Sequence, residues 1–211
     1  MVEHYFTQKP HSEFRKERFE IDILDQRIII NSGSGIFSLK ELDFGTELLI
    51  KNAKLPQTNE ANNKNSDSAI KVLDLGCGYG IVGIALKKKY PELDVTMIDV
   101  NDRAVKLSRQ NCDENDAVCT VLKSDIFSNP EISSKKFDAI LTNPPFSAGK
   151  KVCIDIIEQS HEHLNKNGML ELVAPHNKGG ESLKKVMLSI FGNVDELCKK
   201  RGYRVYVSVR K

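Results

Sequence analysis

The chain has 211 residues, of which 40% are hydrophobic and 28% are charged, a balance typical of a soluble globular protein with room for one core. The net charge of +2 neither requires nor excludes a nucleic-acid partner. The sequence has no apolar run of membrane-spanning length, no apolar core of a secretion signal and no Cys-x-x-Cys spacing among its five cysteines; we therefore expect a cytoplasmic protein without a membrane segment, a disulfide framework or a metal site.

The first part of the chain predicts a small extension in front of the main fold. Phe19–Leu24 and Arg27–Asn31 have the pattern of a β-hairpin, and Asp43–Asn52 has the pattern of a helix. The glycine- and serine-rich segment Ser32–Ser38 separates them. Leu55–Ser68 is polar and rich in asparagine, so we expect a solvated loop with no core to bury.

From Ile70 onward, strand-like and helix-like patterns alternate. The predicted strands are Lys71–Leu75, Asp94–Asp99, Cys119–Leu122, Phe137–Thr142, Met169–Val173, Val194–Cys198 and Tyr203–Val209. The predicted helices are Ile81–Lys89, Asp102–Glu114, Val152–Leu164 and Ser182–Phe191, with Asn167-Gly168 as the C-cap of the third. The last two strands are joined by too few residues for a crossover, so they must pair antiparallel.

This alternation predicts an α/β fold of the Rossmann-like kind, with a mostly parallel seven-stranded sheet and one reversed strand. We divide the chain into an N-terminal extension of hairpin and helix (1–54), a polar loop (55–68) and a core (69–211). The sequence shows no internal repeat. We therefore expect the three parts to form a single structural domain.

A glycine-rich loop, Asp74–Gly80 (DLGCGYG), follows the first core strand. Glycines at Gly76, Gly78 and Gly80 let a ligand approach the backbone because no Cβ intervenes, and ligands bind at the carboxyl ends of parallel strands. The third glycine comes one residue too early for the dinucleotide fingerprint, and the carboxylate of Asp74 would repel a pyrophosphate. The loop therefore favours a nucleoside with a cationic tail, such as S-adenosylmethionine.

Two further aspartates follow core strands. Asp99 ends the second strand, where a carboxylate can accept hydrogen bonds from both ribose hydroxyls. Asp125 follows the third strand and can accept a hydrogen bond from an adenine amino group. Each can instead be a helix cap or a turn residue, and this alternative is stronger for Asp125.

The motif Asn143-Pro144-Pro145-Phe146 follows the fourth core strand. Its prolines stop the strand and stiffen the loop, so one interpretation is that the motif serves only as a rigid exit from the strand. It also suits methyl transfer to an amino group, because the side-chain carbonyl of Asn143 and the backbone carbonyl of Pro144 can hold the two N–H bonds. Phe146 can stack on a base, a contact worth roughly 1–3 kcal/mol. Catalysis would then be mostly positioning.

Basic residues gather in three places. They are Lys9, Arg15, Lys16 and Arg18; Lys150 and Lys151; and Lys199, Lys200, Arg201, Arg204, Arg210 and Lys211. If these clusters converge they can meet RNA phosphates, and otherwise they are solvated faces. Lys150, Pro145 and His176, which follows the fifth strand, are candidate substrate contacts.

The glycine loop, Asp99, Asp125 and the Asn-Pro-Pro-Phe motif, in this order and spacing, resemble class I S-adenosylmethionine-dependent methyltransferases of the methyltransferase small domain group. That group includes guanine-N2 methyltransferases of small-subunit ribosomal RNA. The resemblance covers nearly the whole chain. Ser34–Ile50 resembles a family stretch that closes over the cofactor, which implies Phe37, Ser38 and Thr46 as cofactor or base contacts. His4-Tyr5-Phe6 resembles the start of the short, single-domain archaeal-type relatives.

The resemblance implies an N-methyltransferase that acts on an exocyclic amino group of an RNA base, with guanine N2 of ribosomal RNA as the leading target. Similar motifs occur in adenine-N6 enzymes and in enzymes that methylate a glutamine of release factors. The last group usually has Tyr after the prolines and a helical N-terminal domain, so Phe146 and the expected hairpin count against it. Ser147–Gly149 departs from the His-x-Gly tendency of the bacterial ribosomal enzymes and leaves the accepting base open. A non-catalytic RNA-binding module is the third alternative, which the presence of Asp74, Asp99 and Asn143 disfavours.

Overall fold

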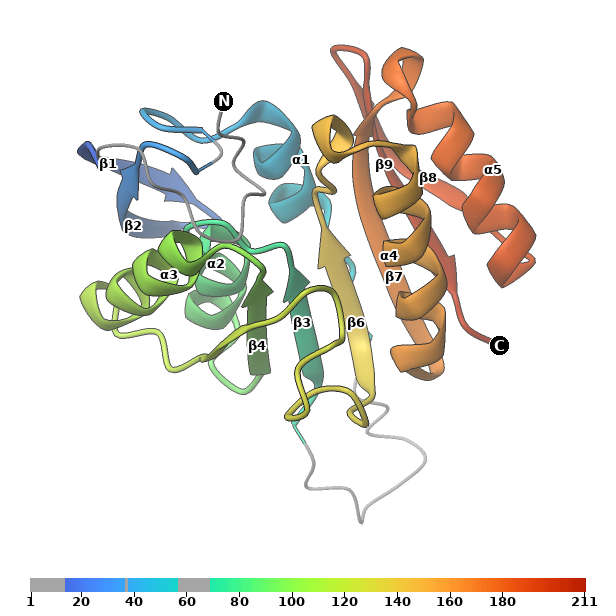
Figure 1. Ribbon diagram of the computed structural model, residues 1–211, viewed down its shortest axis with the longest axis horizontal. Coiled ribbons are helices and arrows are strands. Elements are labelled where there is room, and N and C mark those ends of the chain that lie inside the picture. Colours follow the sequence, from blue (N-terminus) through green and yellow to red (C-terminus); the bar gives the residue numbers. More distant parts are fainter. Residues whose placement is uncertain (1–13, 37, 57–68) are drawn as a thin grey trace.

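A seven-stranded sheet with the order β5-β4-β3-β6-β7-β9-β8 forms the centre of the computed structural model (Figure 1). The structure describes residues 14–36, 38–56 and 69–211. The strands of the sheet are β3 (Lys71–Leu75), β4 (Asp94–Asp99), β5 (Thr120–Lys123), β6 (Phe137–Thr142), β7 (Leu164–Pro175), β8 (Asp195–Lys200) and β9 (Tyr203–Val209). β9 is antiparallel to β7 and β8, and the other neighbours are parallel. The predicted fold, a mostly parallel sheet with one reversed strand, is confirmed.

The helices cover both faces of the sheet. They are α1 (Phe44–Asn52), α2 (Ile81–Lys89), α3 (Asp102–Glu114), α4 (Lys150–His163) and α5 (Gly180–Phe191), with short turns η1 (Phe146–Ala148) and η2 (His176–Lys178). Successive strand residues point to opposite faces, so Met97 joins the core of α1, α2 and α3, whereas Ile98 joins that of α4 and α5. Figure 1 shows α2 and α3 beside the strands on the left of the sheet, and α4 and α5 beside those on its right.

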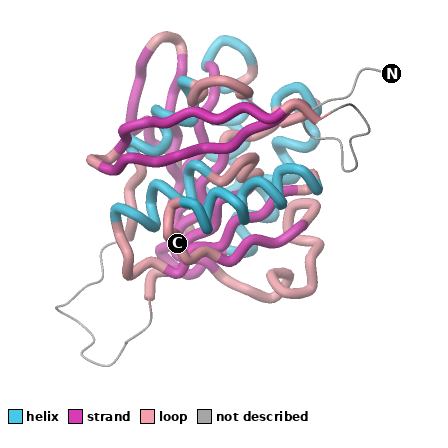
Figure 2. Tube along the Cα trace, turned by 90° about the vertical axis from the view of Figure 1, so that its left-hand side faces the viewer, coloured by secondary structure: helices cyan, strands magenta, loops and turns pink. Residues whose placement is uncertain are grey.

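The N-terminal hairpin consists of β1 (Lys16–Ile23) and β2 (Gln26–Gly33), both longer than predicted. Its strands run side by side over α2 and α3 (Figure 2). Asn111 of α3 and Asn115, the C-cap residue of this helix, bind the backbone of β2 as a neighbouring strand would. Asn111 Oδ1 accepts from the N–H of Asn31 at 2.8 Å, and Asn115 Oδ1 accepts from the N–H of Ile29 at 2.9 Å. The hairpin thereby fixes where the chain leaves β2 and passes to α1.

The predicted C-cap of the third core helix is wrong. α4 ends at His163 and β7 begins at the next residue, so Asn167-Gly168 lies within the strand. Asn167 has a φ of 65°, and the register of β7 against β6 shifts at this point. The asparagine and glycine therefore form a bulge in β7 instead of capping a helix. The other core elements begin and end within two residues of their predicted bounds, except β7, which is longer.

Some sequence expectations lie outside the described residues. These are His4-Tyr5-Phe6, Lys9, Phe37 and most of the polar loop 55–68. Within the part of the chain that the structure describes, no helix has the length and apolar character needed to cross a membrane. The same residues contain no cluster of side chains able to hold a metal ion.

A buried acid lies in the middle of β7. Glu171 is 0% exposed, and its Oε1 accepts a hydrogen bond from the N–H of Lys54 at 2.7 Å. Its Oε2 has no partner among the described residues. Burial raises the pKa of Glu171 to about 8, with the Lys54 N–H acting in the opposite direction. Between these two pKa values, about 4.5 and about 8, Glu171 is therefore protonated in the folded protein and ionised in the unfolded chain.

We expect Glu171→Gln to remove a pH-dependent loss of stability. The pKa of Glu171 is higher in the folded protein than in the unfolded chain. Its contribution to the free energy of unfolding is therefore complete below about pH 4.5 and is lost as the pH rises toward about 8. At pH 8 the variant should have a free energy of unfolding higher than the wild type by up to roughly 4 kcal/mol, and near pH 4.5 the two should agree. Urea denaturation at both pH values measures this, and equal curves at pH 8 would contradict it.

Candidate active site

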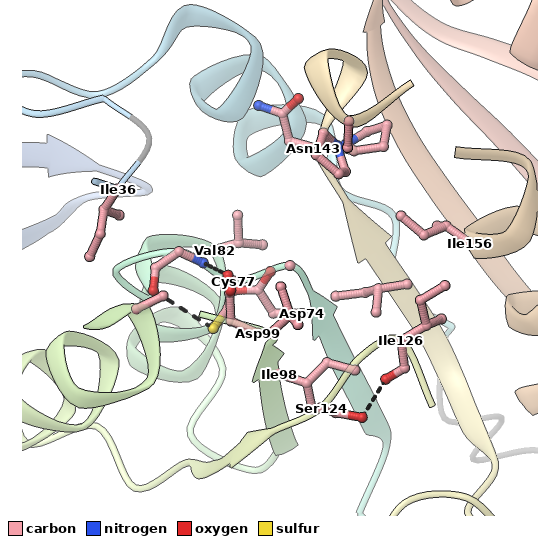
Figure 3. Close-up of a pocket in the computed structure, with 18 of the residues that line it drawn as sticks. Ile36, Asp74, Cys77, Val82, Ile98, Asp99, Ser124, Ile126, Asn143 and Ile156 are labelled. Carbon is pink, nitrogen blue, oxygen red and sulfur yellow. Dashed lines mark hydrogen bonds between the residues drawn. The ribbon is translucent and has the colours of Figure 1, made fainter. Parts of the chain in front are cut away.

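A cavity of about 260 Å³ opens at the carboxyl ends of β3, β4 and β6 (Figure 3). Residues from the glycine loop, from the segments after β4, β5 and β6, from the segment before α1, from the first turns of α1, α2 and α3, and from α4 line it. The lining residues are Ile36, Thr46, Asp74–Tyr79, Ile81, Val82, Ile98–Val100, Ala104, Ser124–Ile126, Asn143–Pro145, Ala148, Val152 and Ile156. The chain thus brings its glycine loop and its Asn-Pro-Pro motif to one space.

The glycine loop is held open by its contacts with β4. The N–H groups of Gly76 and Cys77 both donate to the carbonyl oxygen of Ile98 at 2.9 Å. Gly76 and Gly78 have φ values of 76° and 57°, which disfavour residues with a Cβ. A Cβ on Gly76 would meet nothing within 4 Å. The backbone at this residue therefore borders open space that a ligand can occupy.

Asp74 lies at the base of the cavity. It is 3% exposed, and its Oδ2 accepts a hydrogen bond from the N–H of Gly83 in the first turn of α2 at 3.0 Å. Burial raises the pKa of Asp74 to about 7; the Gly83 hydrogen bond opposes this rise and the charge of Asp99 adds to it. The side chain therefore caps α2 and also places an acid in the cavity.

Asp99 connects the end of β4 to the glycine loop. Its Oδ2 accepts from the N–H of Gly78 at 2.9 Å, and its Oδ1 accepts from the N–H of Asn101 at 2.8 Å. Burial raises the pKa of Asp99 to about 6, against these backbone hydrogen bonds. The expected helix-cap alternative does not apply to Asp99, because Asn101 caps α3. Asp125 is exposed and also borders the cavity.

The amide of Asn143 is fixed by the start of α1. Its Nδ2 donates to Thr46 Oγ1 at 2.9 Å and to Asp43 Oδ2 at 3.2 Å. Asp43 is itself the N-cap of α1 and accepts from the N–H of Thr46 at 2.9 Å. With both amide hydrogens directed at α1, the carbonyl oxygen of Asn143 is the atom able to accept a hydrogen bond from a ligand.

The rest of the Asn-Pro-Pro-Phe motif divides between the cavity and the core. Pro144 and Pro145 line the cavity, and the carbonyl of Pro144 accepts from the N–H of Phe146 at 2.9 Å. A carbonyl oxygen has a second lone pair that remains for another donor. Phe146 does not line the cavity. It packs against the core around α4 and α5 and beside Gly179, so the structure does not support the predicted stacking of Phe146 on a base in the cavity.

Three other predicted contacts also lie away from the cavity lining. Gly80, with a φ of 88°, begins α2, and a Cβ there would come within 3.1 Å of Ser108, so packing and backbone conformation explain this glycine. Lys150 is exposed at the start of α4. His176 Nδ1 lies 2.8 Å from Tyr206 Oη. The structure does not bring these three residues to the cavity, whereas it brings Thr46, Asp74, Gly76, Gly78, Asp99, Asp125, Asn143, Pro144 and Pro145 together around it.

Sequence reasoning missed Asp43 as a site residue and missed the apolar lining. Asp43 was assigned only to the start of a helix, although it stands three residues before Thr46 in the stretch that resembles the family. Apolar lining residues such as Ile36, Val100 and Ile156 carry no signal that separates them from core residues. Only the fold places them around the cavity.

Comparisons with known proteins identify the family of this chain. A family model described as the methyltransferase small domain matches residues 27–207. The "Uncharacterized protein YbxB" of Bacillus subtilis (strain 168) is 37% identical over 206 residues, which cover 97% of each protein. The ribosomal RNA small subunit methyltransferase C of Haemophilus influenzae (strain PittEE) is 37% identical over 178 residues, 81% of this chain and 49% of that protein. The chain thus spans about half the length of the ribosomal RNA methyltransferase it matches.

Solved structures share the fold. The T. thermophilus 16S rRNA N2 G1207 methyltransferase (RsmC), solved in complex with AdoMet and guanosine, matches with a TM-score of 0.74 and 22% identity, over 96% of this chain and 52% of that one. A methyltransferase from Pyrococcus furiosus matches with a TM-score of 0.59 and 21% identity, over 68% of this chain and 76% of that one.

The family resemblance expected from the glycine loop and the Asn-Pro-Pro-Phe motif is confirmed. Because the family model covers most of the chain and YbxB matches over nearly its whole length, this chain belongs to the methyltransferase small domain family.

Proposed function

We propose that this protein is an S-adenosylmethionine-dependent methyltransferase that modifies an exocyclic amino nitrogen of an RNA base, with guanine N2 of ribosomal RNA as its target. The observation that carries this proposal is the Asn143 amide, which Asp43 and Thr46 orient in the cavity that also holds Asp74 and Asp99. An oriented carbonyl oxygen beside a site for a cationic nucleoside is what transfer to an amino group requires.

The hydrogen-bond acceptors, the negative charge and the apolar side chains of the cavity fit the cofactor. Asp99 Oδ1 and Oδ2 each accept one backbone hydrogen bond and retain a lone pair for a ribose hydroxyl. Asp74 supplies negative charge for the cationic amino-acid tail, and the open space at Gly76 leaves room beside the backbone. The aliphatic side chains of Ile98, Val100 and Ile126 offer an apolar surface for a purine. When bound, S-adenosylmethionine supplies an electrophilic methyl group.

The chain's own residues then act by positioning. Asn143 Oδ1 accepts one N–H of the substrate amine, and the second lone pair of the Pro144 carbonyl oxygen accepts the other. Holding both hydrogens turns the nitrogen lone pair toward the methyl group, in place of its delocalisation into the ring. The methylated nitrogen loses its extra proton readily to water, so the reaction needs no strong base from the protein.

Relatives support RNA as the substrate class. The Haemophilus influenzae relative is named for ribosomal RNA, and the T. thermophilus structure holds guanosine. The N-terminal hairpin of this chain differs from the helical N-terminal domain usual for enzymes that methylate release factors. To separate the classes, the protein is incubated with radiolabelled cofactor and either unmodified small-subunit ribosomal RNA or release factors. Label in RNA is expected, and label confined to protein would contradict the proposal.

Cofactor affinity should fall as the pH is lowered. A cationic ligand binds the ionised forms of Asp74 and Asp99, whose pKa values in the ligand-free protein are about 7 and about 6. Below these values protonation competes with binding, so the dissociation constant should rise between pH 8 and pH 5.5 by a factor on the order of 10–100. Titration calorimetry of S-adenosylmethionine measures this, with release of protons on binding at pH 6.5. A dissociation constant independent of pH would show that these acids do not face the cationic ligand.

A further inference from the structure

A basic surface lies beside the cavity and takes no part in the chemistry described above. We define the basic rim as Lys150, Lys178, Lys199, Lys200 and Arg201, all of which are exposed. Lys150 begins α4, Lys178 ends η2, Lys199 and Lys200 end β8, and Arg201 lies in the turn between β8 and β9. Figure 1 shows this turn, the start of α5 and the start of α4 at the same end of the molecule as α1.

The β8–β9 turn is held against the residues that orient Asn143. The guanidinium of Arg201 lies 5.1 Å from the ring centre of Phe44, the first residue of α1. Tyr203 contacts the same ring edge-on, with 5.6 Å between ring centres. Phe44 is the neighbour of Asp43, which binds the Asn143 amide. Arg201 is thereby placed next to the residues that form the reaction site.

The other side of the motif is bordered by η2. The backbone N–H of His176 donates to the carbonyl of Gly202 at 2.8 Å, which ties η2 to the β8–β9 turn. Gly179, the residue after Lys178, lies beside Phe146, since a Cβ on it would be 3.6 Å from the Phe146 ring. The rim therefore borders the Asn-Pro-Pro-Phe motif along η2 as well as along the start of α1.

Acidic side chains nearby do not neutralise the rim. On β8, Glu196 pairs with Lys184 at 2.7 Å and with Arg204 at 3.4 Å. On α5, Glu181 pairs with Lys185 at 3.2 Å. Among the described residues no ion pair joins the five rim side chains to an acid. Their positive charge is therefore available to an anionic partner.

The backbone at Arg201 is itself unusual. Arg201 and Gly202 have φ values of 46° and 81°, as in a two-residue turn with both central residues left-handed. Asparagine or glycine is favoured at the first of these positions, and a long side chain there costs stability. Arg201 therefore places its guanidinium at a position whose backbone favours other residues.

We propose that the basic rim binds the phosphate backbone of single-stranded RNA on either side of the nucleotide whose base enters the cavity. This inference rests on the proposed function. A base enters the cavity only after it leaves its stack, and the flanking phosphates then lie within reach of side chains around the opening. Cations there fix the strand electrostatically without reading its sequence.

The test compares two triple variants of equal charge change. The rim variant is Lys199→Gln, Lys200→Gln and Arg201→Gln. The matched control is Lys71→Gln, Lys135→Gln and Lys166→Gln. These side chains are exposed near the amino ends of β3, β6 and β7, whereas the cavity lies at the carboxyl ends of the strands. Binding of a fluorescent single-stranded RNA is followed by anisotropy from low to moderate salt, and cofactor affinity is followed by calorimetry.

We expect the rim variant to bind RNA at least about tenfold more weakly at 0.1 M salt and to lower the salt slope by about 2, as the loss of three phosphate contacts requires. Cofactor affinity should be unchanged, and the control should bind RNA within about twofold of the wild type. Equal weakening by both triples would overturn the rim. Failure of the wild type to bind RNA would contradict both the proposed function and the proposed role of the rim. Wild-type RNA affinity in the rim variant would contradict only the proposed role of the rim.

Arg201→Asn separates binding from folding. Asparagine suits the left-handed backbone of residue 201, so the variant should unfold at a higher temperature than the wild type while binding the same RNA about fivefold more weakly. A more stable protein with weaker binding supports the rim. Unchanged RNA affinity in this variant would overturn the assignment of Arg201.

Discussion

Asn143→Ala is expected to lower kcat by a factor on the order of 10²–10³, the size of effect seen when an oriented hydrogen-bonding group is removed from a reacting centre. The variant loses the carbonyl oxygen that holds one N–H of the amine, and nothing else in the cavity replaces it. The dissociation constant of S-adenosylmethionine should stay within about threefold of the wild-type value, because the residues assigned to the cofactor lie on β3, β4 and the glycine loop. Single-turnover kinetics and calorimetry measure the two quantities separately.

Asn143→Asp serves as the matched control for this variant. It keeps an acceptor oxygen but loses the amide hydrogens that bind Thr46 and Asp43, and it sets a second carboxylate beside Asp43. Its kcat should therefore also fall, and activity should recover in part at low pH, where one carboxyl is protonated. A comparable loss of cofactor affinity and of kcat in Asn143→Ala would contradict the role of this side chain.

Asp43→Ser is expected to lower kcat about tenfold to hundredfold with little change in KM for the cofactor. Serine still caps α1, so helix stability is retained to within about 1 kcal/mol, but its short side chain cannot reach the Asn143 amide, which Asp43 binds at 3.2 Å. Asp43 acts through Asn143 and is a positioning residue. Steady-state kinetics give the division between kcat and KM.

Two further variants show whether Asp43 acts by orientation or by folding. Asp43→Asn preserves both the cap and the reach of the side chain, so it should restore most of the activity. Thr46→Val removes the second acceptor, which lies 2.9 Å from Asn143 Nδ2, and leaves the cap of α1 intact. It should lower kcat while helix stability is kept. If Asp43→Ser and Asp43→Asn were equally active, the orienting hydrogen bond would be unimportant.

Sequence patterns predicted the fold well because the signals were local and repeated. Short apolar runs alternate with amphipathic stretches from Ile70 onward, and the bounds of β3, α2, β4, α3 and β6 agree with the predicted ones. The error at Asn167-Gly168 has a physical cause. An Asn-Gly pair after an apolar helix suits a C-cap and a strand bulge equally well, and only the register of β7 against β6 distinguishes them.

The candidate site was predicted where a residue type carries its own chemistry. Asp74, Asp99 and Asn143 stand at strand ends, so topology alone brings them together. Phe146 could not be placed in this way, because the direction of a side chain after two prolines depends on the packing of α4 and α5. Asp43 was missed for a similar reason, since its hydrogen bond to Asn143 spans 100 residues of sequence.

The most direct test of the central claim is the identity of the methylated atom. Unmodified small-subunit ribosomal RNA is incubated with the protein and S-adenosylmethionine carrying a deuterated methyl group, then digested to nucleosides and analysed by mass spectrometry against standards. The proposed function predicts the heavy methyl group on an exocyclic nitrogen, as N2-methylguanosine, with none formed by Asn143→Ala. A heavy methyl group on a ring atom or a ribose hydroxyl, or in protein alone, would contradict the account.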